Sequence, residues 1–131
     1  MAFWGAPLAR EDHADCAVEA AIAMQTEVQL FNLQRQSLDL PPLRVRIGIE
    51  SGQAVVGDLG TRFRSAYTAI GDVVNVAERL QEAVRNQPCH IAMGVGAASR
   101  LTRHTAHALG SIPLRGRPGR EPIYTVAQHI A

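Results

Sequence analysis

The segment from Tyr67 to Leu80 constrains the fold of this chain more than any other. It predicts a short strand, a glycine turn at Gly71 and a helix to about Asn86 that begins near Asp72, its expected N-cap. Apolar residues recur along the helix at the spacing of one buried face, namely Val73, Val76, Ala77, Leu80 and Val84. A strand that turns into an amphipathic helix predicts a helix packed on a sheet.

Two polar side chains lie at the edge of this apolar stripe. Asn75 and Arg79 are four residues apart, so they share one face of the helix. One amide and one guanidinium therefore point the same way, just inside a helix N-terminus. This arrangement suits a ribose oxygen and a phosphate whose charge is changing. The alternative is a solvated helix surface, which an isolated pair with this spacing does not exclude.

The remaining segments predict alternating strands and helices. The expected elements are a strand at 2–4, a helix at 11–33, strands at 43–50 and 53–58 joined by a tight turn at Gly52, a strand at 89–93, a short helix at 97–103 and a closing hairpin of 109–114 with 123–128. The order β-α-β-β-α-β is typical of an α+β fold in layers.

Several motifs occur in the order of a known family. The run from Tyr67 to Leu80 resembles the signature of the class III adenylate/guanylate cyclases. The stretch 46–60 resembles the hairpin before that signature, 1–7 resembles the strand that leaves the second metal carboxylate, and 114–117 with 121–126 resembles the closing hairpin. The chain is therefore identified as the C-terminal portion of such a catalytic domain, a single partial domain over 1–131. The resemblance implies a ferredoxin-like α+β core, truncated at its N-terminus.

The resemblance also implies roles for individual residues. Asn75 would hydrogen-bond the ribose, and Arg79 would stabilise the transition state on the triphosphate. Thr68 matches the position that reads the adenine edge, which favours ATP over GTP. Arg115 and Arg117 match the basic loop that contacts the terminal phosphates, and Arg117 is the preferred candidate. The competing interpretations are a solvated helix face for the first pair, an ordinary strand residue for Thr68 and a solvated turn for the last pair.

The family's metal ligands fall outside the matched segment. Class III cyclases bind two divalent ions, Mg²⁺ or Mn²⁺, through two Asp residues upstream of the position that Met1 matches, and a Lys that helps read adenine also lies upstream. The metals polarise the phosphates and help to generate the attacking alkoxide. We therefore expect no metal bound to this chain alone and little or no catalysis by it alone. Whether Met1 is a true start, an internal methionine or a boundary stays open.

Three aspartates are poor substitutes for those ligands. Asp12 and Asp15 fall at the expected start of a helix, where acidic residues favour the helix dipole. Asp39 precedes Pro41 and Pro42 in a loop.

The family mechanism requires two domains that pair head to tail. One subunit brings the metals, and the other brings the Asn, the Arg and the adenine-reading Thr. The ribose 3′-oxygen attacks the α-phosphate and pyrophosphate leaves. We expect a homodimer, with swapped elements as one form it can take, because the missing strand would leave an exposed ladder.

Composition bounds the remaining possibilities. At 131 residues the chain is one domain or a large part of one. A net charge of +1 gives no electrostatic case for nucleic acid or for membrane contact. The two cysteines, Cys16 and Cys89, suggest neither a disulfide framework nor a zinc site. Without a signal peptide or a spanning segment, the expected location is cytoplasmic.

Two functions remain in competition. The first is a nucleotidyl cyclase domain in signal transduction that makes a 3′,5′-cyclic nucleotide from ATP or, less favoured, GTP. The second is a non-catalytic remnant that serves dimerisation or regulation.

Overall fold

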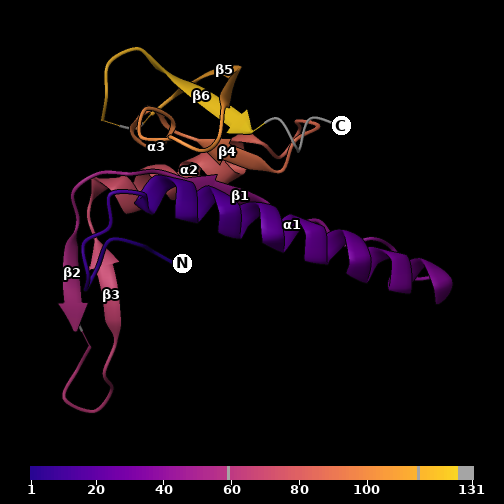
Figure 1. Cartoon of the computed structure of the whole chain (residues 1–131), viewed down its shortest axis with the longest axis horizontal. Coiled ribbons are helices and arrows are strands. Elements are labelled where there is room, and N and C mark those ends of the chain that lie inside the picture. Colours follow the sequence, from indigo (N-terminus) through magenta and orange to yellow (C-terminus); the bar gives the residue numbers. More distant parts are fainter. Residues whose placement is uncertain (59, 115, 127–131) are drawn as a thin grey trace.

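A four-stranded mixed sheet lies between two helices in the computed structural model, which describes residues 1–58, 60–114 and 116–126 (Figure 1). The strand order is β1-β4-β6-β5, formed by Ile47–Ile49, Ile91–Met93, Arg120–Val126 and Ala106–Pro113. β1 runs parallel to β4, whereas β4 with β6 and β6 with β5 are antiparallel. The mixture of helices with a mixed sheet confirms the predicted α+β class.

The two long helices cover opposite faces of this sheet. α1 (His13–Ser37) packs against Ile91 and Met93 of β4, and α2 (Asp72–Ala83) packs in a second cluster that includes Ala92. Successive side chains of a strand point to opposite faces, so three consecutive residues of β4 serve both layers. All three are fully buried, which places β4 at the centre of the core.

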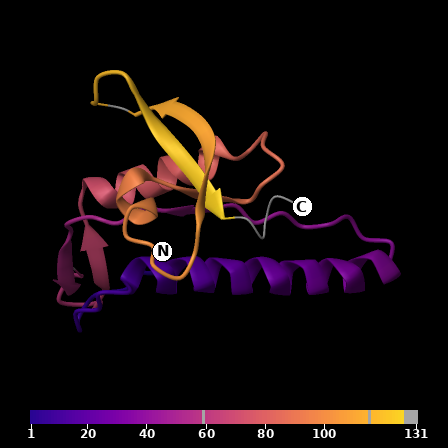
Figure 2. The same ribbon diagram turned by 45° about the horizontal axis from the view of Figure 1, so that its top comes forward.

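A separate hairpin projects from one end of the sheet (Figures 1 and 2). It consists of β2 (Val55–Asp58) and β3 (Tyr67–Ile70), with Gly57 opposite Thr68. The carboxylate of Asp58 accepts hydrogen bonds from the backbone N–H of Gly60 at 3.2 Å and of Ala66 at 3.0 Å. One carboxylate therefore helps to hold the two ends of the loop together.

The expected hairpin between 43–50 and 53–58 is wrong. β1 pairs instead with β4, and β2 pairs with β3. The segment between β1 and β2 leads from the four-stranded sheet to the separate hairpin. Glu50 fixes this path, because its carboxylate accepts hydrogen bonds from the backbone N–H of Ser51 and of Ala97, both at 2.9 Å. The N–H of Gly94 also donates to the carbonyl of Ile49 at 3.0 Å. The contacts with Ala97 and Gly94 are long-range, and they direct the chain from the four-stranded sheet to the hairpin instead of reversing it.

The expected strand at 2–4 is also wrong, since these residues are irregular. A strand needs a partner for its ladder hydrogen bonds. This segment packs through side chains instead, with the rings of Phe3 and Tyr67 centred 5.8 Å apart.

Other boundaries move by a few residues. α1 begins and ends later than expected, and α2 has Gly71 rather than Asp72 as its N-cap and ends at Ala83. The short helix α3 covers Val95–Ala98, earlier than the predicted 97–103. The closing hairpin is confirmed, with β5 at Ala106–Pro113 and β6 at Arg120–Val126. The last two residues of its predicted second strand, 127–128, lie outside the described residues.

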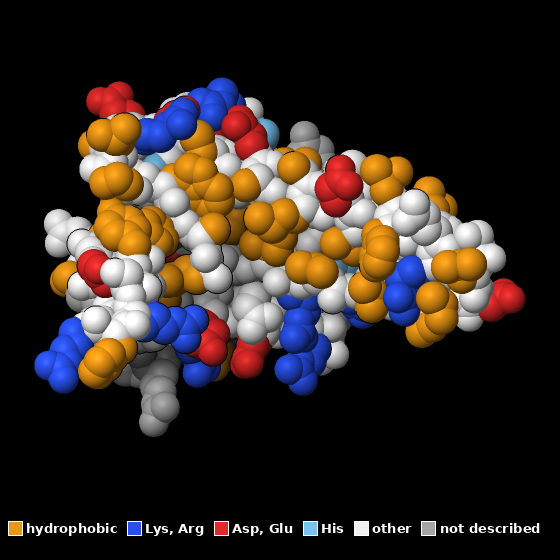
Figure 3. Space-filling view, turned by 90° about the horizontal axis from the view of Figure 1, so that it is seen from below, with side chains coloured by type: hydrophobic (Ala, Val, Ile, Leu, Met, Phe, Trp, Pro, Cys, Tyr) orange, Lys and Arg blue, Asp and Glu red, His pale blue; other side chains and the backbone are white. Residues whose placement is uncertain are grey.

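The far half of α1 extends beyond the sheet with residues 38–46 running back along it (Figure 2). Asn32 joins the two segments, because its side chain donates to the carbonyl of Leu43 at 2.9 Å and accepts from the N–H of Leu43 at 2.8 Å. Apolar side chains gather along α1 and residues 38–46, on the side of the molecule seen in Figure 3. The exposed ones include Met24, Leu30, Phe31, Leu33, Leu38, Leu40 and Leu43. Within the described ranges, no helix combines the length and apolar character needed to cross a bilayer.

Candidate functional site

The exposed face of α2 forms one wall of a hollow of about 490 Å³. The helix is fixed by its apolar stripe, in which Val76 and Leu80 are buried against the sheet. That anchoring turns Asn75 and Arg79 outward into the hollow. The full lining is Asp72, Asn75, Val76, Glu78, Arg79, Glu82, Leu114 and Arg117.

The two polar residues that the sequence singled out remain accessible. Arg79 is exposed, and its guanidinium makes one long hydrogen bond, from Nη2 to the carbonyl of Pro113 at 3.4 Å. Asn75 is also exposed. An amide and a guanidinium on one helix face, with donors that no described residue occupies, can hold an oxygen-rich anionic ligand.

Arg117 reaches the same hollow from the loop between β5 and β6. Gly116 and Gly119 flank it with φ of 80° and 75°, a backbone conformation that favours glycine. The guanidinium forms an ion pair with Asp72 at the start of α2, and its Nη1 lies 3.8 Å from Oε1 of Glu121. The hydrogen bond and charge of Asp72 raise the pKa of Arg117.

A smaller hollow of about 280 Å³ adjoins the first. It shares Asp72 and Arg117 with the larger hollow and adds the carboxylates of Glu50 and Glu121. Arg117 therefore stands at the boundary between the two hollows, on a rim that is rich in acidic groups.

The structure brings together three of the five predicted site residues. Asn75, Arg79 and Arg117 line one hollow although the third is 38 positions beyond the second in the chain. Thr68 lies half-buried on β3 and is not part of this lining. Arg115 lies outside the described residues. Asp72 is the lining residue that sequence reasoning assigned only to capping.

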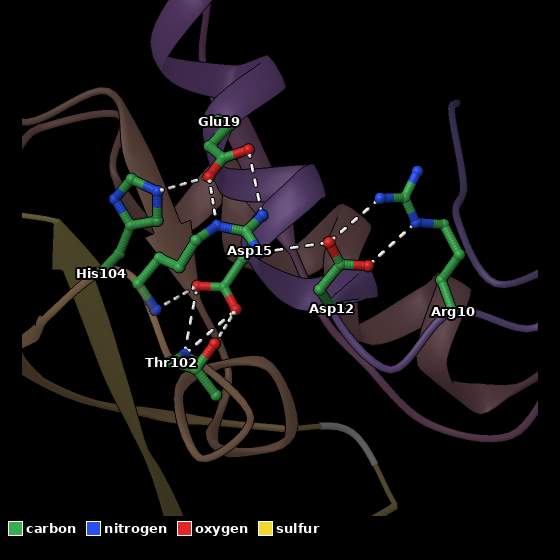
Figure 4. A network of polar contacts seen from close by, with 7 residues as sticks. Arg10, Asp12, Asp15, Glu19, Thr102 and His104 are labelled. Atoms are coloured by element: carbon green, nitrogen blue, oxygen red, sulfur yellow. Dashed lines mark hydrogen bonds and ion pairs between the residues drawn. The ribbon is translucent and has the colours of Figure 1, made fainter.

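The aspartates Asp12 and Asp15, which the sequence left as poor substitutes for the metal ligands, do not fit a divalent metal site, because both are held in a network of polar contacts (Figure 4). Within the described residues, no group of three or more His, Cys, Asp or Glu side chains is placed so that it could hold one metal ion. Asp15 is fully buried, and it accepts hydrogen bonds from the N–H and hydroxyl of Thr102 and from the N–H of Arg103 at 2.9 to 3.2 Å. Asp12 is paired with Arg10 and Arg103. The carboxylate oxygens of Asp12 and Asp15 are therefore already occupied by hydrogen bonds and ion pairs within the protein.

The same group of residues ties α1 to the loop before β5. Arg103 donates to both carboxylate oxygens of Glu19 at 2.9 and 3.2 Å, and His104 Nε2 lies 3.2 Å from Glu19 (Figure 4). The hydrogen bond from Arg103 lowers the pKa of Glu19. Sequence reasoning assigned Asp15 only to the helix dipole, whereas the structure places it among the buried residues of α1, beside Ala14 and Val18.

Comparisons with known proteins agree with this architecture. The family described as "Adenylate and Guanylate cyclase catalytic domain" matches residues 1–128. Adenylate cyclase 1 of Rhizobium meliloti is 36% identical over 127 residues, which is 96% of this chain and 19% of that protein. The chain therefore spans about a fifth of that relative's length.

Two crystal structures resemble the fold closely. One is the guanylyl cyclase Cya2, with a TM-score of 0.81 and 28% identity over 95% of this chain and 62% of that chain. The other is the adenylyl cyclase CyaB from P. aeruginosa, with a TM-score of 0.81 and 28% identity over 95% of this chain and 64% of that chain. The expected class III cyclase fold is confirmed, and the chain belongs to the adenylate and guanylate cyclase catalytic domain family.

Proposed function

We propose that this chain supplies the nucleotide-binding half of a class III nucleotidyl cyclase site, as a single partial domain over 1–131. The supporting observation is that Asn75, Arg79 and Arg117 line one hollow. The proposed reaction converts ATP, or less readily GTP, to the 3′,5′-cyclic nucleotide and pyrophosphate in signal transduction. Thr68 favours ATP in this proposal through the family position that it matches.

The proposed roles follow from the chemistry of each side chain. Asn75 orients the ribose by hydrogen bonding, so that the 3′-oxygen faces the α-phosphate. Arg79 offers a fixed fork of N–H donors to the charge that shifts toward the leaving pyrophosphate. Arg117 holds the terminal phosphates in this proposal, and Arg115 is the second candidate for that role. Positioning and charge stabilisation carry such a reaction.

In this proposal, a partner subunit binds the divalent metal ions. The family uses such ions, but the described carboxylates do not fit them, so no step is assigned to a metal held by this chain. We propose that the chain alone is inactive or nearly so and that it works beside a subunit that supplies the metal half-site.

A homodimer is the proposed assembly of this chain by itself, and a cytoplasmic location is proposed with it. Catalysis is proposed only for a pair in which the other subunit carries the metal ligands. β1 ends the order of the four-stranded sheet, so one of its edges has no strand beside it within the described residues. Such an edge pairs readily with another chain. Exchange of an element between two copies is one way to cover it, and light scattering would report the assembly directly.

The second candidate is a remnant that keeps the fold for dimerisation or regulation without catalysis. The absence of a converging carboxylate cluster in the described ranges favours it. The two candidates differ in one measurable property, which is nucleotide binding at the hollow.

Titration with a fluorescent non-hydrolysable ATP analogue tests the proposal. We expect Arg79→Ala to weaken binding about tenfold, as for a lost charge-assisted hydrogen bond, and Asn75→Ala to weaken it severalfold. Arg85→Ala is the matched control, because Arg85 is exposed just past α2 and does not line the hollow. Absence of binding by the unchanged chain, or equal affinities for all variants, would favour the remnant.

A further inference from the structure

Arg117 is surrounded by carboxylates. It pairs with Asp72, lies 3.8 Å from Glu121, and is close enough to Glu50 for that charge to contribute to its raised pKa. In this arrangement the guanidinium has its charge balanced by the protein. A phosphate that uses Arg117 must therefore compete with a carboxylate that already holds it.

The contact that holds Arg117 can open. The side chains of Asp72 and Arg117 are 67% and 40% exposed, and ion pairs exposed to water contribute little stability. A β-carbon added to Gly116 or to Gly119 would meet no atom within 4 Å, so these two positions of the loop are not packed against the rest of the fold. The guanidinium can leave Asp72 without breaking the core.

The charge of the hollow makes this contact important for ligand affinity. Its lining includes two guanidiniums, Arg79 and Arg117, and three carboxylates, Asp72, Glu78 and Glu82. While Asp72 holds Arg117, Arg79 is the one guanidinium among the described lining residues that is not ion-paired and is free to meet a triphosphate. Release of Arg117 would add a second cation for the phosphates, although it would leave Asp72 without its counter-ion.

We propose that Asp72 sets the affinity of this site for nucleoside triphosphates by competing with phosphate for Arg117. This inference rests on the proposed function of the hollow. Asp72 is three residues before Asn75 and seven before Arg79, so it shares their helix face and lies where phosphate oxygens would approach. The opposite role, in which Asp72 holds Arg117 ready for the phosphate, predicts the opposite change in affinity on substitution.

Isothermal titration of the chain with inorganic tripolyphosphate and with the ATP analogue distinguishes these roles. Asp72→Asn keeps the size of the side chain and removes its charge. We expect it to tighten the binding of both ligands by about threefold or more, because the guanidinium is freed and one repulsive charge is lost. Glu121→Gln should act in the same direction with a smaller effect.

A double-mutant cycle separates competition for Arg117 from general repulsion. In an Arg117→Ala background, the increase in affinity caused by Asp72→Asn should fall to the increase caused by Glu78→Gln. Glu78→Gln is the control because Glu78 lines the hollow but takes no part in the ion pair of Asp72 with Arg117. The gain from Glu78→Gln itself should be the same with and without Arg117.

The outcomes are distinct for this inference and for the proposed function. If Arg79→Ala weakens binding as expected while Asp72→Asn leaves it unchanged or weakens it, the competition is wrong and the proposed site stands. If neither the unchanged chain nor Asp72→Asn binds either ligand, the proposed function fails and the inference fails with it.

Discussion

Gly48 of β1 lies directly against the backbone of α2 at Ala77. A β-carbon on Gly48 would stand 2.0 Å from the carbonyl oxygen of Ala77 and 2.6 Å from the nitrogen of Gln81. Because the obstacle is backbone, it cannot rotate away. The distance between α2 and the sheet, and with it the position of Asn75 and Arg79, therefore depends on a residue without a side chain.

Gly48→Ala should destabilise the fold by about 2–4 kcal/mol, as overpacking against fixed backbone does. Urea unfolding monitored by circular dichroism measures the change. Gly57→Ala is the control, since a β-carbon there would meet nothing within 4 Å, and it should change stability far less. Equal losses for the two variants would show that the contact at Ala77 is not the cause.

Asp15→Asn should destabilise the chain by about 2 kcal/mol or more, because the N–H groups of Thr102 and Arg103 would lose a buried, ionised acceptor. Asp39→Asn is the matched control, as Asp39 is exposed with φ of 56°, a conformation that Asn tolerates. Thermal melts at pH 7 compare the two variants. A melting temperature equally shifted in both would argue against a structural role for the buried carboxylate.

The same carboxylate predicts acid sensitivity. Desolvation raises the pKa of Asp15, but hydrogen bonds from Arg103 and Thr102 outweigh it, so the pKa lies below its ordinary value of 3.8. A lowered pKa stabilises the fold above the ordinary value, and this contribution disappears as the pH falls through the lowered one. Unfolding followed from pH 6 to pH 2 should show a loss of stability below about pH 4 that Asp15→Asn reduces. An identical acid dependence for both proteins would contradict this assignment.

Leu80→Ala should cost about 2–5 kcal/mol, the usual range for a leucine truncated in a core. Leu80 is 1% exposed and supports the helix between Asn75 and the end of α2. Leu33→Ala makes the same chemical change on a residue that is 63% exposed and should have little effect. Chemical denaturation of both variants checks this prediction, and a small loss for Leu80→Ala would mean that α2 is not anchored through this contact.

Thr68→Ala should change the preference between ATP and GTP analogues severalfold without changing the affinity for tripolyphosphate, which has no base. The preference should change because the Thr68 hydroxyl can donate to or accept from a base edge. The affinity for tripolyphosphate should not change because Thr68 does not line the hollow that contains Asn75 and Arg79. Competition titrations against the fluorescent ATP analogue give the ratio. A parallel loss of tripolyphosphate affinity would indicate a general structural effect instead of base recognition.

Local patterns in the sequence were sufficient for several features. The spacing of apolar residues predicted α2 and turned Asn75 and Arg79 outward, because helical periodicity depends only on neighbours in the chain. The closing hairpin of β5 and β6 was likewise predicted from two strands and a glycine-rich turn. The pairing of β1 was not, since parallel strands meet through long connections whose path no local pattern specifies.

By itself, the sequence determined the α+β class, the family and the helix face that presents Asn75 and Arg79, because motif order and periodicity are properties of the chain. Only the tertiary structure decided that Asp72 holds Arg117, 45 positions away, and that Asp15 is buried beneath Thr102, 87 positions away. Such contacts depend on which distant segments the packed sheet brings together, and the chemistry of each residue alone does not specify its partner.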